Sequence, residues 1–181
     1  MDIALPHTIE IIAREKLAFL GTVIKDGAEC LEFVHEIQPT WGPAMHVHYQ
    51  QDESITVVSG VMGYQEFGGQ PKHAVPGETL LFKAGTPHRF WNAGLDMLYC
   101  KGYNSPANNV VYFLSAFARS INEHGGKPGI YDAAFLLKRY KSEFGMLEIP
   151  AFVQKVIFPV ILFWGNLTGK SKKFADAPPP I

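Results

Sequence analysis

The sequence has few cysteines, and the two present, Cys30 and Cys100, are too few for a disulfide framework or a thiolate zinc site. Both stand among apolar residues, so we expect buried free thiols. A formal net charge of -1 provides no concentrated basic face, which argues against nucleic-acid binding. The first residues lack a basic stretch leading into an apolar one, so we expect no secretion signal and a cytoplasmic protein.

Several catalytic motifs are also missing. The glycine-rich segment FGGQPK at 67–72 is followed by neither a helix nor a Lys-Ser/Thr pair, so it is a turn and no phosphate-binding loop. The sequence contains no internal repeat of useful length, and no pairing of a nucleophile with a base stands out.

Short runs of β-branched and aromatic residues dominate the first part of the chain. Between Ile9 and Tyr103, segments such as SITVVSG, VMGYQEF and TLLFK are separated by turns rich in glycine and proline. This pattern is typical of an all-β sandwich or barrel. At 181 residues the chain fits one domain with an appendage, and we place the β-domain at residues 1–105.

The pattern changes to helical spacing after the turn YNSPANN. NVVYFLSAFARSI carries apolar residues three and four positions apart, and DAAFLLKRYKSEF opens with Asp132, a candidate N-cap. We therefore expect residues 106–181 to form a helical C-terminal extension. The proline-rich end, KSKKFADAPPPI, is expected to be frayed.

A third apolar segment runs from Ile149 to Leu167, close to the ~20 residues that a membrane span needs. Gln154, Lys155 and Pro159 interrupt it, which argues against a span. We expect it to pack on the barrel or on a partner subunit of a homodimer, because an exposed apolar run would promote aggregation. Peripheral membrane contact is the alternative, supported by the basic cluster Lys170, Lys172 and Lys173.

The stretch HVHYQQDESITVVSG, from His46 to Gly60, carries the chemistry. On a strand, residues two apart share a face, so His46 and His48 project together. The link to Glu53 is long enough to bring a carboxylate back to the same centre. His88, after a Gly-Thr-Pro turn, offers a third imidazole. Three imidazoles and a carboxylate suit iron, manganese, nickel or zinc, although a lone His-x-His is more often incidental.

These residues resemble the two motifs of the cupin superfamily. In the first motif, His-x-His is followed by Glu and then by Gly. The chain matches it with His46, His48, Glu53 and Gly60, with four residues between His48 and Glu53 and six between Glu53 and Gly60. The leading glycine departs from the usual spacing of this motif, because only three residues separate Gly42 from His46. The second motif is matched by the set Gly77, Gly85, His88 and Asn92, with Lys83 where a proline is usual.

The resemblance implies a single cupin barrel, that is, a double-stranded β-helix or jelly roll. It also implies that His46, His48, Glu53 and His88 hold a divalent transition metal. We expect a metal-dependent enzyme acting on a small organic molecule, with dioxygenase chemistry as the first hypothesis and Glu53 as ligand or base. Isomerisation and decarboxylation would use the same ligands. A non-catalytic module that binds or senses a small molecule or a metal is the second hypothesis, and an interaction protein is the third.

Neighbouring residues leave alternatives open. Asn92 shares phase with His88 and Phe90, and it either supports a ligand or occupies a turn. Four aromatic residues could form a rim around the pocket, although core packing explains them equally well: Tyr64, Trp91, Tyr99 and Tyr103. We expect no metal role for the remaining histidines, His7, His35, His73 and His124, with cavity lining as the alternative for His35.

Overall fold

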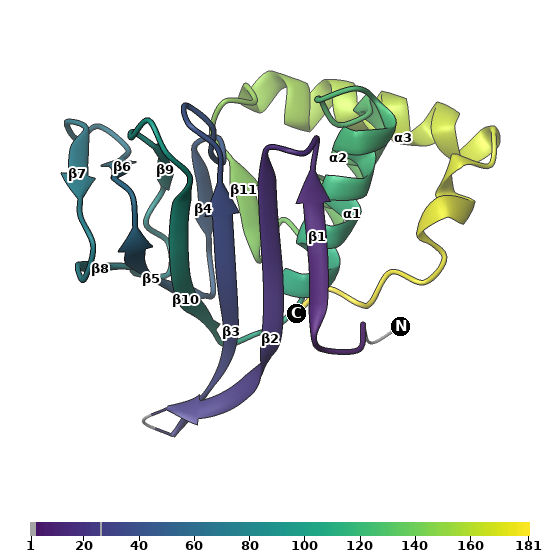
Figure 1. The fold of residues 1–181 in the computed structure, drawn as a ribbon. Coiled ribbons are helices and arrows are strands. Elements are labelled where there is room, and N and C mark those ends of the chain that lie inside the picture. Colours follow the sequence, from purple (N-terminus) through teal and green to yellow (C-terminus); the bar gives the residue numbers. More distant parts are fainter. Residues whose placement is uncertain (1–2, 26) are drawn as a thin grey trace.

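The computed structural model describes residues 3–25 and 27–181, which form two antiparallel sheets flanked by helices (Figure 1). The first sheet has six strands, in the order β1 (His7–Ile11), β2 (Glu15–Lys25), β3 (Ala28–Ile37), β10 (Leu98–Ser105), β5 (Asp52–Ser59) and β8 (Thr79–Phe82). The second has five, in the order β11 (Phe144–Met146), β4 (His46–His48), β9 (His88–Asn92), β6 (Met62–Glu66) and β7 (Lys72–Ala74).

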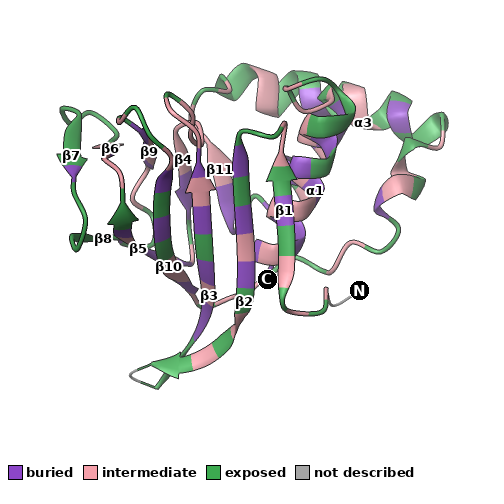
Figure 2. Cartoon of the chain, viewed as in Figure 1, coloured by how far each residue is buried: buried purple, intermediate pink, exposed green. Residues whose placement is uncertain are grey.

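Side chains alternate between core and surface along these strands, as a sheet with one buried face requires. On β9, His88, Phe90 and Asn92 are buried while the two residues between them are half-buried. Figure 2 shows the same banding on β2, β3 and β10. The apolar core lies between the sheets and includes Phe19, Leu31, Ile55, Met62 and Leu98, all fully buried.

The sheet-rich fold that the sequence predicts is present, but the strand pairings of the described residues leave two separate sheets. Closure into a barrel therefore stays a prediction. The division at residue 105 also stays a prediction. The later part of the chain nevertheless contributes β11, which pairs with β4 so that Phe144 lies opposite His48 and Met146 opposite His46.

The helical extension contains α1 (Val110–Glu123), α2 (Ile130–Arg139), a π-helical turn η1 (Val153–Ile157), α3 (Phe158–Leu167) and a 3-10 turn η2 (Lys170–Phe174). Asp132 does not cap α2, because the helix already starts after Gly129. The hydroxyl of Ser120 accepts the Gly129 N–H, and the helix is thereby capped three residues before Asp132. The Asp132 carboxylate instead accepts hydrogen bonds from Ser120 and Lys173.

The proline-rich end is held against α2, which corrects the expectation of fraying. The Arg139 guanidinium donates to the carbonyls of Ala177 and Pro178, and the Tyr140 hydroxyl donates to the latter as well. The Ser142 hydroxyl donates to the carbonyl of Ile181. Carbonyls of an extended proline segment have no partners of their own, so donors at the end of α2 satisfy them.

Candidate metal centre

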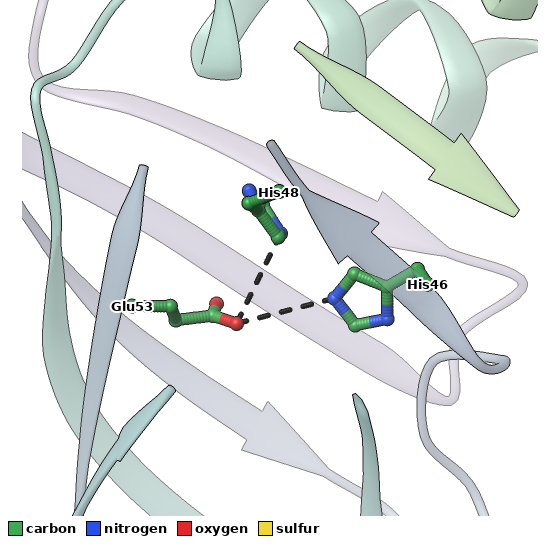
Figure 3. Close-up of side chains that lie close together, drawn as sticks. All are labelled: His46, His48 and Glu53. Carbon is green, nitrogen blue, oxygen red and sulfur yellow. Dashed lines mark ion pairs between the residues drawn. The ribbon is translucent and has the colours of Figure 1, made fainter. Parts of the chain in front are cut away.

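The candidate ligands come from both sheets and meet between them. His46 and His48 project from β4, and Glu53 reaches them from β5 of the facing sheet (Figure 3). The chain crosses from one sheet to the other in the three residues between β4 and β5. His88 lies directly opposite His46 in the pairing of β4 with β9.

Glycines of the two motifs lie where the chain passes between the sheets again, from β5 to β6 and from β8 to β9. Gly60, at the end of β5, and Gly85, before His88, have φ angles of 90° and 81°, which favour glycine over any residue with a Cβ. Gly42 has a different reason, since a Cβ there would lie 2.2 Å from the Phe90 carbonyl oxygen. The displaced first glycine of the motif thus lets the loop before β4 lie against β9.

One carboxylate oxygen is the focus of the site. Glu53 Oε2 lies 3.9 Å from Nε2 of His46, 3.9 Å from Nε2 of His48 and 2.8 Å from Nε2 of His88. The ligand atoms of His46, His48 and Glu53 all lie within 4.8 Å of one another. His88 joins this group through Glu53, and its ring stacks on Phe82 with the centroids 3.9 Å apart. Ligands of one ion lie ~3.0–3.4 Å apart at bond lengths of ~2.1 Å, so the two 3.9 Å separations would need to shorten by roughly 0.5–0.9 Å.

Backbone carbonyls fix the tautomers of two imidazoles. His46 Nδ1 lies 2.8 Å from the carbonyl of Ala44, and His88 Nδ1 lies 2.9 Å from that of Thr86. A carbonyl only accepts hydrogen bonds, so each Nδ1 carries a proton and each Nε2 lone pair is directed at the centre. His88 Nε2 and the Glu53 carboxylate then face each other at 2.8 Å, which requires either a second proton on His88 or a cation.

The protonation states also suit a metal. Burial, together with the charges of His48 and His88, lowers the pKa of His46 to about 3. Burial likewise lowers the pKa of His48. Burial alone would raise the pKa of Glu53, but the hydrogen bond with His88 and the charges of the three histidines outweigh it and lower that pKa. Neutral imidazoles beside an ionised carboxylate are the forms that bind a divalent ion. The residues present therefore fit the metal that the motifs imply.

One atom of the site is left unsatisfied. The buried Nδ1 of His48 has no hydrogen-bond partner in the described part of the chain. Histidine ligands usually donate this second N–H to a carbonyl or carboxylate. His48 is instead held by apolar contact, with its ring edge-on to Phe144 at a centroid distance of 5.4 Å.

His46, His48 and Glu53, but not His88, line a cavity of about 470 Å³, a size that accommodates a small organic molecule. Its walls are mostly apolar and come from both sheets and from α1, among them Phe33, Phe90, Phe113, Phe117 and Phe144. Phe113 of α1 stacks on Phe144 of β11 with centroids 4.2 Å apart, next to the His48 ring. The C-terminal extension therefore forms one wall of the site.

A second polar group lies in the same cavity. Glu15 Oε1 lies 2.7 Å from His35 Nε2, and the Trp41 indole N–H donates to Glu15 Oε2 at 3.0 Å. All three residues line the cavity. The sequence reading favoured a structural role for His35, whereas the structure places it in the wall. Glu15 and Trp41 were not anticipated, because they lie far from the motifs in sequence.

The structure distinguishes the alternatives left open for the surroundings. Asn92 occupies a turn, since its side-chain amide donates to the carbonyls of Ile37 and Asp96 and its oxygen accepts the Gly94 N–H. The four aromatic residues of the possible rim, Tyr64, Trp91, Tyr99 and Tyr103, are not part of the cavity wall. Trp91 is out of phase with Phe90, and its indole fills the space left by Gly63, where a Cβ would lie 2.2 Å from the ring.

A second cluster of potential ligands, Glu123, His124 and Asp132, does not resemble the first. Lys173 Nζ pairs with a carboxylate oxygen of Glu123 and with one of Asp132, so the lysine ammonium group already balances these negative charges. His124 Nδ1 donates to the Ser120 carbonyl. This cluster is thus an ion pair that ties η2 to α1 and α2.

Comparison with known proteins supports the motif assignment. Residues 33–100 match the family model described as a cupin domain, which confirms the resemblance for this part of the chain. This match contains all four candidate ligands. No curated protein matches the chain.

Three solved structures illustrate the likeness at the level of the fold. KdgF from Halomonas sp. is 14% identical, with 58% of this chain and 92% of that chain covered and a TM-score of 0.49. An uncharacterized conserved protein with a double-stranded beta-helix domain from Klebsiella pneumoniae is 22% identical, with 60% and 84% covered and a TM-score of 0.42. A putative sugar phosphate isomerase from Acidithiobacillus ferrooxidans is 19% identical, with a TM-score of 0.41. The alignment covers 46% of this chain and 54% of the isomerase chain.

Proposed function

We propose that the cupin domain holds a divalent transition metal through His46, His48, Glu53 and His88 and catalyses a dioxygenase-like reaction on a small apolar molecule. The observation that supports this most directly is the convergence of three imidazole Nε2 atoms on one carboxylate oxygen, that of Glu53, in the wall of a mostly apolar cavity. Iron, manganese, nickel and zinc all accept this ligand set.

Each residue of the chain has a distinct part in this proposal. His46 and His48 supply neutral nitrogen donors, and Glu53 supplies a negative charge that offsets part of the charge of the ion. When bound, the metal supplies Lewis acidity and coordination positions for substrate or dioxygen. The lowered pKa of Glu53 favours the ligand role over the base role, because a carboxylate that binds its proton weakly is a weak base.

The cavity wall indicates the class of substrate. No lysine or arginine of the described residues lines it, so a phosphate or sulfate ester would enter without a counter-charge. Aromatic and aliphatic side chains exclude water and favour an uncharged, apolar molecule. The Glu15–His35 pair provides a polar group that a hydroxyl or carbonyl of such a molecule could contact.

The proposal is tested by elemental analysis of the purified protein, followed by oxygen-uptake measurements with panels of aromatic and diketone compounds. Stoichiometric redox-active metal with substrate-dependent oxygen uptake is the expected result. Zinc with no turnover on any compound would overturn the dioxygenase and leave a module that binds a small molecule or senses metal.

Ligand assignment is tested separately by metal content. The double variant His46→Ala with His88→Ala should lose stoichiometric metal, because two of the four donors are removed. His73→Ala, which removes an exposed histidine from β7, is the matched control and should retain it. The single variant His88→Ala decides whether this residue is a ligand or only a partner of Glu53. Full metal retention there would remove His88 from the set.

A further inference from the structure

The helix made of η1 and α3 has an apolar side that no part of the described chain covers. We call Phe152, Val156, Val160, Phe163, Trp164 and Leu167 the outward face. Phe152, Phe163, Trp164 and Leu167 are between 59% and 66% exposed, unusually high for large apolar side chains. In Figure 2 this segment is mainly green, with only isolated bands of pink and purple.

The spacing shows that the exposure follows one side of the helix. Phe152, Val156, Val160, Phe163 and Leu167 are four, four, three and four residues apart, which is the repeat of a single helical stripe. A surface helix normally carries polar residues on the side that faces water. Here that side is apolar along the whole length of α3, so it is a continuous surface rather than a scatter of single residues.

The opposite side of the same helix is fixed on the protein. Phe158 and Gly165 are buried, and a Cβ on Gly165 would lie 2.0 Å from the ring of Tyr131 on α2. The Tyr131 hydroxyl donates to the side-chain oxygen of Asn166 at 2.8 Å. Close packing and this hydrogen bond keep the helix against α2, so the outward face cannot turn inward to bury itself.

Within the segment that carries the outward face all charged side chains are lysines, and Glu148 and Asp176 lie directly outside its two ends. The segment 149–175 contains four lysines, and all 17 acidic residues of the chain lie outside it. Lys155, Lys170 and Lys172 are exposed, near the two ends of the stripe. Lys173 is engaged with Glu123 and Asp132. The free positive charge therefore borders the apolar stripe, an arrangement complementary to a surface that is apolar inside and anionic outside.

We propose that the outward face docks on the surface of an anionic phospholipid bilayer. The stripe would lie flat in the interface, with Trp164 at the level of the headgroups and the three exposed lysines beside lipid phosphates. Val153 to Leu167 spans ~22 Å along its axis, which suits a helix lying in the plane of the interface. No helix in the described ranges is long and apolar enough to cross a membrane.

A second copy of the chain fits this surface less well. Antiparallel pairing of two such helices would bring Lys155 of one copy near Lys170 and Lys172 of the other. Parallel pairing would place each lysine beside its own counterpart. The segment offers no acidic side chain to offset either contact. Like charges in contact disfavour both pairings, whereas lipid phosphates satisfy all three lysines.

The test is co-sedimentation of the full chain with large vesicles, independently of bound metal. One set contains phosphatidylcholine alone and the other contains one quarter phosphatidylglycerol. We expect clear binding to the anionic vesicles, at least tenfold weaker binding to the neutral ones, and a decrease with added salt. No binding to either set, or equal binding to both, would overturn the proposal.

Two pairs of variants locate the surface. Phe163→Ser with Leu167→Ser should lower the partition constant at least tenfold, while Leu95→Ser, on the exposed turn between β9 and β10, should leave it unchanged. Lys170→Gln with Lys172→Gln should also lower it, while Lys72→Gln with Lys101→Gln should not. A dimer in sedimentation velocity that Phe163→Ser with Leu167→Ser dissociates would show that a second copy covers the face, and would overturn the proposal.

Discussion

The molecule has two apolar surfaces, and they differ in where their polar groups lie. The cavity is concave, and polar side chains lie within its wall, where His46, His48 and Glu53 point at one another. The outward face of α3 is convex, and its charges lie at its ends. Polar groups inside a closed apolar space can orient a small molecule, whereas charges at the border of an open stripe can only align it with another surface.

This difference explains why the two surfaces tolerate substitution differently. A residue in the cavity wall contacts other side chains on several sides, so removing it leaves a void that costs stability. A residue on the outward face contacts mainly solvent, and its removal exposes little that was buried. Variants of the same residue type on the two surfaces therefore separate folding from surface binding.

The largest effect is expected at Phe113, which is buried and stacks on Phe144 beside the candidate metal centre. Phe113→Ala should lower the free energy of unfolding by about 3–5 kcal/mol, measured by urea denaturation, because a large void opens between α1 and β11. Phe113→Leu, which retains most of the volume, should cost about 1 kcal/mol. Equal effects of the two variants would show that the ring stacking, rather than the filled volume, holds this wall.

The sequence predicts which residues come together at the candidate metal centre, while metal binding by them stays a prediction. The His-x-His pattern on a strand, and glycines at Gly60 and Gly85 that need positive φ, are local features that can be recognised without a structure. They place His46 and His48 on one face and return the chain toward His88. Local patterns succeed here because each depends on a few neighbouring residues.

Features that depend on distant pairing could not be predicted. Phe144 reaches the His48 ring through the three-residue strand β11, about a hundred residues away in sequence, and no periodicity marks so short a strand. Glu15 meets His35 only because of the register of β2 against β3. For Trp91 the sequence left a place at the pocket and core packing both open, and only the pairing of β6 with β9 shows that its ring lies against Gly63.

A second prediction compares two ion pairs, one inside the cavity and one on the surface. Glu15→Gln removes the charge that accepts hydrogen bonds from His35 and Trp41, and should cost about 1.5–3 kcal/mol of stability in urea denaturation. Glu32→Gln breaks the exposed pair with Lys25 and should change stability by less than about 1 kcal/mol. Metal content should be unchanged in both. Loss of metal in Glu15→Gln would show that the two polar groups of the cavity are one site.

A third prediction fills the cavity. Leu114 of α1 lines it, so Leu114→Trp should weaken binding of an uncharged fluorescent naphthalene dye about tenfold, or ~1.4 kcal/mol, by taking up part of the space. Leu95→Trp adds the same ring at an exposed position and is the control. Unchanged dye affinity in Leu114→Trp would mean that small apolar molecules bind elsewhere, with the outward face of α3 as the first candidate.

The smallest effect is expected at Phe163, whose side chain is 59% exposed on the outward face. Phe163→Ala should change the free energy of unfolding by less than about 0.5 kcal/mol, because little area is newly exposed and alanine favours the helix. Phe158→Ala, five residues earlier and 5% exposed, should cost about 3 kcal/mol. Both values come from urea denaturation without lipid. A cost above about 1 kcal/mol for Phe163→Ala that grows with protein concentration would mean that a second copy already covers this face in solution, because only an interface makes an exposed side chain contribute to stability in that way.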